Sequence, residues 1–196
     1  MKVVILCGGF GTRLSEKTKL LPKPMVEIGN NPILWHIMNI YGKYNFKEFI
    51  LALGYKSEII KDYFINYNLR HSDFKLKLKS GEITIKDSNI EDWNITLKET
   101  GLNTLTGGRL LSLKDELKSS STFMLTYGDG VSDIIINDLI KFHRSHGKIA
   151  TVTAVRPTAR FGGLKIENKK VINFKEKPHS GEGWINGGFF VFEKEI

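Results

Sequence analysis

A glycine-rich stretch near the N-terminus, Gly8-Gly9-Phe10-Gly11, directly follows the apolar run Lys2–Cys7. Glycines after a buried strand allow backbone N–H groups to turn toward a bound anion, and their missing Cβ atoms permit close approach. The loop then carries Arg13, and ten residues later Lys23 lies between two prolines, which stiffen the backbone around it. The pattern predicts a phosphate-binding loop in which Arg13 and Lys23 point toward the bound anion. The alternative is a flexible connection whose two cationic side chains are solvated.

Two familiar phosphate-binding motifs do not fit this loop. The P-loop pattern G-x-x-x-x-G-K-[ST] does not occur, and Gly9-x-Gly11-x-x-Leu14 lacks the third glycine of the dinucleotide fingerprint. A dinucleotide-binding loop also leads straight into a helix, whereas Pro22 and Pro24 forbid a regular helix here. We therefore expect an anion site of another kind.

A carboxylate follows a second apolar run. Asp129 lies between two glycines just after Phe123–Tyr127. Ligands of open α/β sheets collect beyond the carboxyl ends of the strands, so this side chain could reach a Mg²⁺ that bridges phosphates. Gly-Asp-Gly is also ordinary turn chemistry, and that interpretation stays open. Asp133 is more typical of a helix cap than of a ligand.

The elements that must position these residues alternate between strand and helix. The apolar runs 2–7 and 49–53, with helical patterns from Pro32 and over 57–66, predict β-α-β-α. This order favours an α/β fold with a mostly parallel sheet and helices on both faces. Period-two runs predict a small strand-rich insertion near 74–98. The remaining expected elements are helices over 107–118 and 134–143, the latter capped by Ser132 or Asp133, and strands at 123–127, 150–155, 163–166, 171–174 and 188–192.

Composition excludes several classes of protein. A single cysteine among 196 residues excludes a disulfide framework, and no apolar run approaches the roughly 18 residues of a membrane span. We expect a cytoplasmic protein without a membrane partner. The net charge of +8 suggests nucleic acid, but the lysines are scattered, so we expect no nucleic-acid partner. The histidines show no spacing typical of a metal site or a catalytic triad.

Several segments together resemble one family. Gly8–Leu14 with Pro22-Lys23-Pro24-Met25 resembles the pyrophosphorylase motif of sugar-1-phosphate nucleotidylyltransferases. The continuation, Pro24–Gly29 and Pro32–Met38, resembles the branch that transfers a cytidylyl group from CTP to glucose 1-phosphate. Three further segments agree with that branch, Thr106–Arg109, Tyr127–Val131 and Asn186–Phe190, and the resemblance runs the whole length. It departs at Cys7, where alanine is usual in the family.

The resemblance implies a Rossmann-like nucleotidyltransferase fold, Mg²⁺ as cofactor, and CDP-glucose and pyrophosphate as products. It assigns the leaving phosphates to Arg13, the α-phosphate to Lys23 and the metal to Asp129. It implies nucleotide-binding roles for Leu6, Gly8, Gly9, Gly11, Thr12, Arg13, Lys23, Thr106, Gly108, Arg109 and Gly128. Sugar-phosphate binding is implied for Glu176, Lys177, Asn186 and Gly187.

Taken without the resemblance, some of these residues have ordinary interpretations. Thr106–Arg109 could be an anion-binding helix N-terminus or a plain helix start. Lys177 could be a surface lysine, and Asn186-Gly187 could begin a strand rather than meet sugar hydroxyls.

The resemblance also concerns the C-terminus. The family continues past the last residues of this chain, 193–196, and carries a second metal-binding aspartate there. We therefore expect residues 1–196 to form a single nucleotidyltransferase domain that is C-terminally incomplete, slow in turnover, and a homo-oligomer when complete. The alternatives are a transferase using dTTP or UTP, a nucleotide-binding subunit without turnover, and a basic nucleic-acid-binding protein.

Overall fold

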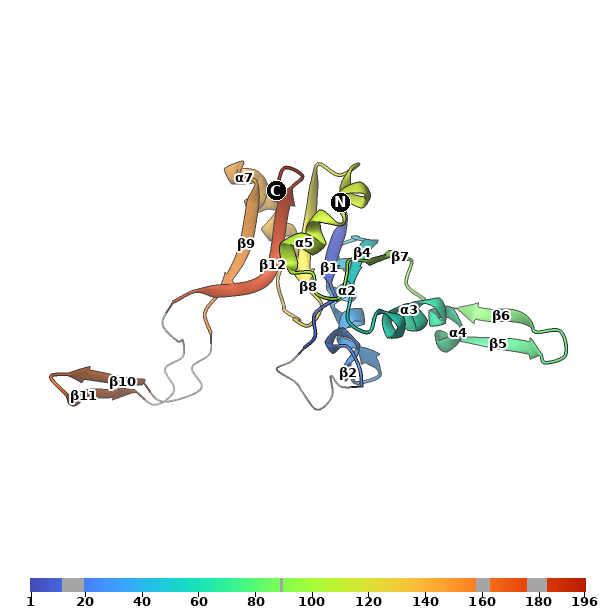
Figure 1. Ribbon diagram of the computed structural model, residues 1–196, viewed down its shortest axis with the longest axis horizontal. Coiled ribbons are helices and arrows are strands. Elements are labelled where there is room, and N and C mark those ends of the chain that lie inside the picture. The colour runs from blue at the N-terminus through green and yellow to red at the C-terminus, as the bar shows by residue number, and fades with distance from the viewer. Residues whose placement is uncertain (12–19, 89, 158–162, 176–182) are drawn as a thin grey trace.

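The computed structural model describes residues 1–11, 20–88, 90–157, 163–175 and 183–196 (Figure 1). Within them, a six-stranded sheet runs in the order β7-β4-β1-β8-β12-β9. Its strands are β1 (Val3–Leu6), β4 (Glu48–Leu53), β7 (Asn94–Glu99), β8 (Thr122–Tyr127), β9 (Ala150–Val155) and β12 (Ile185–Glu193). Strands β7, β4, β1 and β8 are parallel neighbours, and β12 runs antiparallel to β8 and β9. The expected mostly parallel sheet is confirmed.

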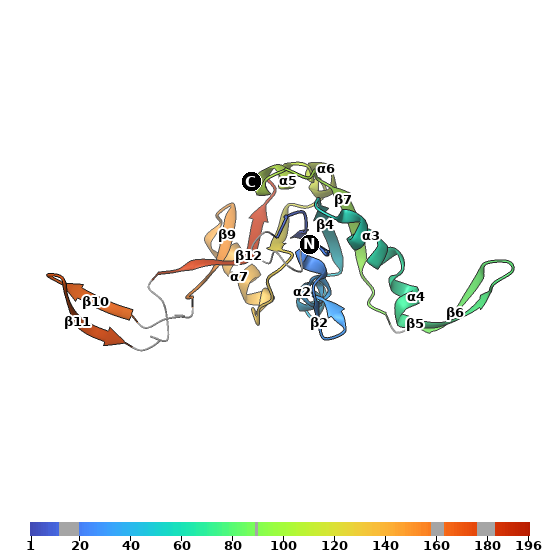
Figure 2. The same ribbon diagram turned by 60° about the horizontal axis from the view of Figure 1, so that its bottom comes forward.

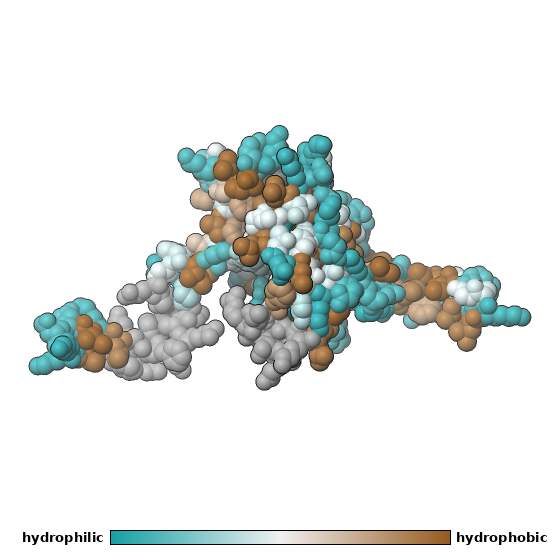
Figure 3. All heavy atoms as spheres, in the orientation of Figure 1, coloured by the Kyte–Doolittle hydropathy of each residue, from teal (hydrophilic) through white to brown (hydrophobic). Residues whose placement is uncertain are grey.

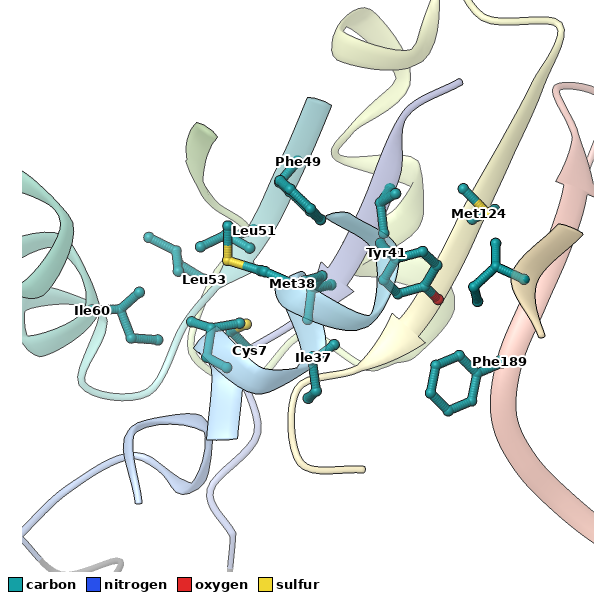
Figure 4. Close-up of a cluster of buried hydrophobic side chains, with 14 of the residues drawn as sticks. Cys7, Ile37, Met38, Tyr41, Phe49, Leu51, Leu53, Ile60, Met124 and Phe189 are labelled. Carbon is teal, nitrogen blue, oxygen red and sulfur yellow. The ribbon is translucent and has the colours of Figure 1, made fainter. Parts of the chain in front are cut away.

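Helices cover both faces of this sheet, as expected. The helices are α2 (Ile33–Gly42), α3 (Ser57–Ile65), α4 (Tyr67–His71), α5 (Thr106–Leu111), α6 (Lys114–Leu117) and α7 (Ile136–His146). Alternate residues of β1 enter two different cores: Val3 and Ile5 pack with α2, α3 and α7, whereas Val4 packs with α6. Figure 4 shows the first core, where Tyr41 of α2 meets Phe189 of β12. Burial on both faces explains the uninterrupted apolar run of β1.

The strand-rich insertion is smaller than expected. Strands β5 (Ser72–Lys77) and β6 (Glu82–Ser88) form an antiparallel hairpin that projects from the body of the molecule (Figure 2). The run at 93–97, which was expected to belong to this insertion, is instead β7, the edge strand of the central sheet, paired parallel with β4. An edge strand is half exposed, so its residues alternate between polar and apolar as those of a hairpin do.

The remaining strands lie outside the central sheet. Strands β10 (Gly163–Glu167) and β11 (Lys170–Lys175) form a second hairpin, and β2 (Glu27–Ile28) pairs with β3 (Asn31–Pro32). The β5–β6 hairpin exposes apolar side chains, among them Phe74 and Leu76. In Figure 3 this projecting hairpin carries brown, hydrophobic spheres. No helix within the described residues is long and apolar enough to cross a membrane.

Two helix predictions need correction. The helix expected over 107–118 is divided into α5 and α6, and the hydroxyl of Ser112 donates to the carbonyl of Gly108 at 2.9 Å where α5 ends. The helix expected over 134–143 begins at Ile136, beyond both expected caps. Ser132 instead accepts a hydrogen bond from the N–H of Ile134 at 3.2 Å. Here short-range side-chain bonds to the backbone compete with the regular helix.

A hydrogen-bonded relay of histidines joins α7 to β9 and β12. The N–H of Lys148 donates to Nδ1 of His146 at 2.9 Å, so Nε2 of the neutral ring donates to the hydroxyl of Thr151. That hydroxyl lies 2.7 Å from Nδ1 of His143, whose Nε2 donates to the Glu193 carboxylate at 2.9 Å. These two histidines, His143 and His146, thus serve the packing of α7 against the edge of the sheet.

This relay leads to a prediction about acid. The hydrogen bonds from His143 and then Thr122 hold the pKa of Glu193 below its usual value of 4.5. Because the folded state lowers this pKa, the stabilisation is present above 4.5 and is lost as the pH falls through the lowered value. We expect Glu193→Gln to lower the free energy of unfolding by ~1 kcal/mol at pH 7, and by progressively less below pH ~4.5.

Urea unfolding of both proteins between pH 7 and pH 3 measures this difference. The exposed neighbour Glu195, changed to Gln, is the control. A difference that stays constant over the whole range would contradict the role assigned to the Glu193 carboxylate.

Candidate active site

A cavity of about 400 Å³ is lined by residues at the carboxyl ends of β1 and β8, by the segment that follows β7 and by the η2 turn at Lys23–Met25. This is the edge at which open α/β sheets bind ligands, and the volume suits a small molecule. Nine of the residues expected at the site line it: Leu6, Gly8, Gly9, Gly11, Lys23, Thr106, Arg109, Gly128 and Asp129. The other described lining residues are Cys7, Phe10, Pro24, Leu102, Asn103, Thr104, Leu105 and Tyr127. The glycine-rich loop and Asp129, 118 residues beyond Gly11 in the sequence, therefore share one cavity.

The start of the glycine-rich loop is held by backbone hydrogen bonds to β4 and to the segment that follows β4. The N–H of Cys7 donates to the carbonyl of Ala52 at 2.9 Å, and the carbonyl of Gly8 accepts from the N–H of Tyr55 at 3.2 Å. A Cβ on Gly8 would clash with the guanidinium of Arg109. At Gly9 no atom of the described residues stands within 4 Å of such a Cβ, which would enter open space beside the cavity. Packing thus requires glycine at position 8, whereas Gly9 lines the cavity without such a constraint from the described residues.

Lys23 begins a short 3₁₀ turn, η2 (Lys23–Met25), between the extended Pro22 and the buried Pro24. The turn is closed by the N–H of Met25, which donates to the carbonyl of Pro22 at 2.8 Å. The ring of Pro24 packs against Gly128, where a Cβ would stand 2.9 Å from Pro24 Cγ and 2.8 Å from the Leu6 carbonyl. This contact requires glycine at 128 and brings the η2 turn against the end of β8.

As a result, the Lys23 ammonium forms an ion pair with the Asp129 carboxylate across the cavity. Both side chains keep some exposure, 23% for Lys23 and 33% for Asp129, so a ligand can reach them. An ammonium has three N–H donors, and one bond to Asp129 leaves two for a phosphate. The proline-flanked Lys23 therefore contacts Asp129, the carboxylate that was predicted separately from the sequence.

Arg109, which was expected to bind the nucleotide, lines the cavity but is held by hydrogen bonds within the protein. Its guanidinium is buried and donates to the carbonyls of Leu53, Gly8, Gly101 and Leu102, at 2.7 to 3.2 Å, and to the hydroxyl of Thr100 at 2.7 Å. All of its four terminal N–H groups are therefore occupied by the protein. Desolvation by burial lowers the pKa of Arg109. The geometry makes Arg109 a support for the loops around the cavity, and its role as a nucleotide contact stays a prediction.

The segment 102–105 was not expected at the site, yet it forms one wall of the cavity. This loop follows β7, and the turn of Gly101, at φ +93°, directs it toward the cavity. A signal was present, because a loop after a parallel strand belongs to the ligand-binding edge. It was missed because β7 was assigned to the insertion. Gly108, expected at the site, does not line the cavity but packs beneath Thr104, whose Cγ2 would stand 2.8 Å from a Cβ there.

The residues expected to bind the sugar phosphate are only partly described. Asn186 and Gly187 begin β12 and do not line the cavity, although the amide of Asn186 donates to the hydroxyl of Tyr127, which does. Thr12, Arg13, Glu176 and Lys177 lie outside the described residues.

The site offers no activated nucleophile at Cys7. This thiol is buried, and burial, followed by the charge of Asp129, raises its pKa well above the usual value of 9.0. The thiol therefore stays protonated and inert at neutral pH.

The described residues contain no group of three or more histidine, cysteine, aspartate or glutamate side chains that could cage a metal ion. What the cavity does offer is one partly exposed carboxylate, Asp129, beside room for phosphates. Mg²⁺ is commonly held by one or two carboxylates together with substrate phosphates and waters. The donor set fits a magnesium ion that arrives with the nucleotide.

The chain is similar to known proteins in sequence and in fold. A family model described as nucleotidyl transferase matches residues 2–196. The chain is 48% identical to glucose-1-phosphate cytidylyltransferase of Salmonella typhi and to a probable glucose-1-phosphate cytidylyltransferase of Bacillus subtilis, in each case over the whole chain and 76% of the relative. Among solved structures, HddC of Yersinia pseudotuberculosis superposes with a TM-score of 0.65 at 27% identity, covering 99% of this chain and 77% of that one.

Proposed function

Because the chain belongs to the nucleotidyl transferase family, we propose that it transfers a cytidylyl group from CTP to α-D-glucose 1-phosphate. The products are CDP-glucose and pyrophosphate. The observation that carries the reaction class is the ion pair of Lys23 and Asp129 on the cavity beside the glycine-rich loop. The 48% identity to named glucose-1-phosphate cytidylyltransferases over the whole chain supports the choice of base and sugar.

The chemistry needs electrostatics more than proton transfer. A sugar phosphate has a second pKa of about 6, so it is already an anionic nucleophile at neutral pH. The difficulty is that two anions must meet in line while charge grows around the α-phosphorus. Correctly placed cations lower this barrier because they bind the transition state more strongly than the ground state. This accounts for a site with a lysine and a carboxylate but no described histidine.

Each described residue of the site has a separate role in the proposed reaction. The N–H groups of the glycine-rich loop bind phosphate oxygens, and Lys23 places its two remaining donors on the α-phosphate. Asp129 holds Lys23 in place and is the residue that would hold Mg²⁺. When bound, the ion neutralises phosphate charge and orients the leaving pyrophosphate. We assign the β- and γ-phosphates to Arg13, on the resemblance of Gly8–Leu14 to the family motif.

The assignment of base and sugar leads to a direct prediction. With glucose 1-phosphate, pyrophosphate is expected to form faster from CTP than from dTTP or UTP, and with CTP faster from glucose 1-phosphate than from its galactose and mannose counterparts. Coupled detection of pyrophosphate in the presence of Mg²⁺ measures all of these rates. Equal rates with the three nucleotides would remove the cytidylyl assignment and leave nucleotidyl transfer in place.

One further outcome has a separate meaning. If the protein binds CTP but releases no pyrophosphate with any sugar 1-phosphate, it is a nucleotide-binding subunit.

The expected homo-oligomer, the single-domain organisation and the cytoplasmic location stay predictions.

A further inference from the structure

Tyr127 connects the cavity to the strand that was expected to bind sugar. It is the last residue of β8, lies two residues before Asp129, and lines the cavity. Its ring meets Phe190 of β12 edge-on, with the ring centroids 5.8 Å apart and the planes at 83°. The side-chain amide of Asn186, also on β12, donates to the Tyr127 hydroxyl at 3.3 Å. The two side chains thus join neighbouring antiparallel strands beside the cavity.

Two glycines allow this contact. Gly188 has φ +83°, a conformation that other residues rarely adopt, and a Cβ there would stand 3.2 Å from the Tyr127 ring. A Cβ on Gly187 would stand 3.0 Å from the carbonyl of Thr153 on β9. The carbonyl of Gly188 also accepts a hydrogen bond from the hydroxyl of Thr126 at 2.8 Å. The backbone of β12 is therefore pressed onto the end of β8, and Asn186 comes within reach of Tyr127.

The hydrogen bonds fix the orientation of the Asn186 amide. Its Oδ1 accepts from the N–H of Gly188 at 2.7 Å, and its Nδ2 donates to Tyr127. A rotated amide would set the nitrogen against a backbone donor, so only one orientation is satisfied. One amide N–H and one lone pair of Oδ1 remain unused by the described residues. A neighbouring donor and acceptor are complementary to the hydroxyl groups of a sugar, each of which both donates and accepts.

We propose that Tyr127 is a positioning residue for recognition of the sugar: its hydroxyl orients the amide of Asn186 so that the amide hydrogen-bonds hydroxyl groups of the hexose 1-phosphate. The inference rests on the proposed function and extends it, because it names the element that distinguishes hexoses differing in one hydroxyl. Nucleotide binding, on the glycine-rich loop and Lys23, does not depend on this pair.

The experiment measures binding rather than turnover alone. Glucose 1-phosphate is titrated by calorimetry into the full chain saturated with a non-hydrolysable CTP analogue and Mg²⁺, and the titration is repeated with galactose 1-phosphate and mannose 1-phosphate. We expect Tyr127→Phe to weaken glucose 1-phosphate binding by about 2- to 10-fold, the effect of one neutral hydrogen bond, with the affinity for the CTP analogue unchanged. Discrimination between glucose 1-phosphate and its galactose epimer is expected to fall by a similar factor.

A double-mutant cycle separates positioning from a general structural effect. Asn186→Ala is expected to weaken sugar binding at least as much as Tyr127→Phe, and the combined variant no more than Asn186→Ala alone, because the tyrosine acts through the asparagine. Tyr44→Phe, at a partly buried tyrosine outside the cavity lining, is the matched control, with unchanged binding expected. Thermal unfolding checks that each variant is folded.

The failures can be told apart. If Tyr127→Phe leaves sugar binding unchanged, or if the effects of the two substitutions multiply, the inference is wrong while the proposed function stands. An equal loss of affinity for the CTP analogue also overturns the inference, since it indicates a general disturbance of the cavity. If the unaltered chain binds the nucleotide analogue but none of the three sugar 1-phosphates, the proposed function and the inference are both wrong.

Discussion

Lys23→Ala is expected to lower kcat by roughly 100-fold while the KM for CTP changes little, on the scale seen when one electrostatic stabiliser is removed. Negative charge around the α-phosphorus increases only as the bonds exchange, so the ammonium binds the transition state more strongly than the ground state. Lys23 lies on the cavity, held by Asp129 and by the turn between Pro22 and Pro24. Steady-state kinetics with varied CTP and saturating glucose 1-phosphate measure the two constants separately.

Lys43→Ala is the matched control, since this exposed lysine at the end of α2 lies outside the cavity lining. An increase in KM with kcat preserved would show that Lys23 binds substrate and transition state equally, which contradicts its assignment. If the Lys43 variant loses activity to the same degree, net charge rather than position is responsible.

Arg109→Ala is expected to lower the free energy of unfolding by at least ~3 kcal/mol and to abolish nucleotide binding as a consequence. The substitution removes all five hydrogen bonds of the guanidinium and opens space between β4 and the glycine-rich loop. The carbonyls of Leu53 and Gly8 keep only their bonds from Thr100 and Tyr55. Losing hydrogen bonds from a charged donor in a buried site is costly, and the cavity left behind adds to the loss. Urea unfolding gives the loss of stability, and calorimetric titration with CTP gives the loss of binding.

Two comparisons make this prediction specific to Arg109. Arg144→Ala, at an exposed position on α7, is expected to change stability by no more than about 0.5 kcal/mol. Arg109→Lys retains the charge but not the fork of donors, so it is expected to be nearly as unstable as the alanine variant. A stable Arg109→Ala protein that fails to bind CTP would instead identify this side chain as a direct ligand contact.

The sheet illustrates what local patterns predict well. The apolar β-branched run of β1 and the helical spacing of α2 are properties of neighbouring residues, and they correctly predicted strand, helix and a parallel sheet. Strand β7 was misassigned because alternation of polar and apolar residues indicates only that one face of a strand is exposed. It does not indicate which strand lies beside it. Its place next to β4 depends on pairing between residues 46 apart in the sequence, such as Glu48 with Asn94.

In the candidate site, too, some features follow from the local sequence and others only from the tertiary structure. The sequence alone determined the glycine-rich loop, the stiffened Lys23 and the carboxylate Asp129, because glycine and proline set backbone conformation locally and side-chain type sets charge. Only the tertiary structure decided that Lys23 pairs with Asp129, that Arg109 supports Gly8, and that Tyr127 meets Asn186. These partners lie 106, 101 and 59 residues apart in the sequence. They become neighbours because burial of the apolar faces of the sheet brings the carboxyl ends of its parallel strands together, next to the start of the antiparallel strand β12. The periodicity of the sequence does not show which strand ends are neighbours.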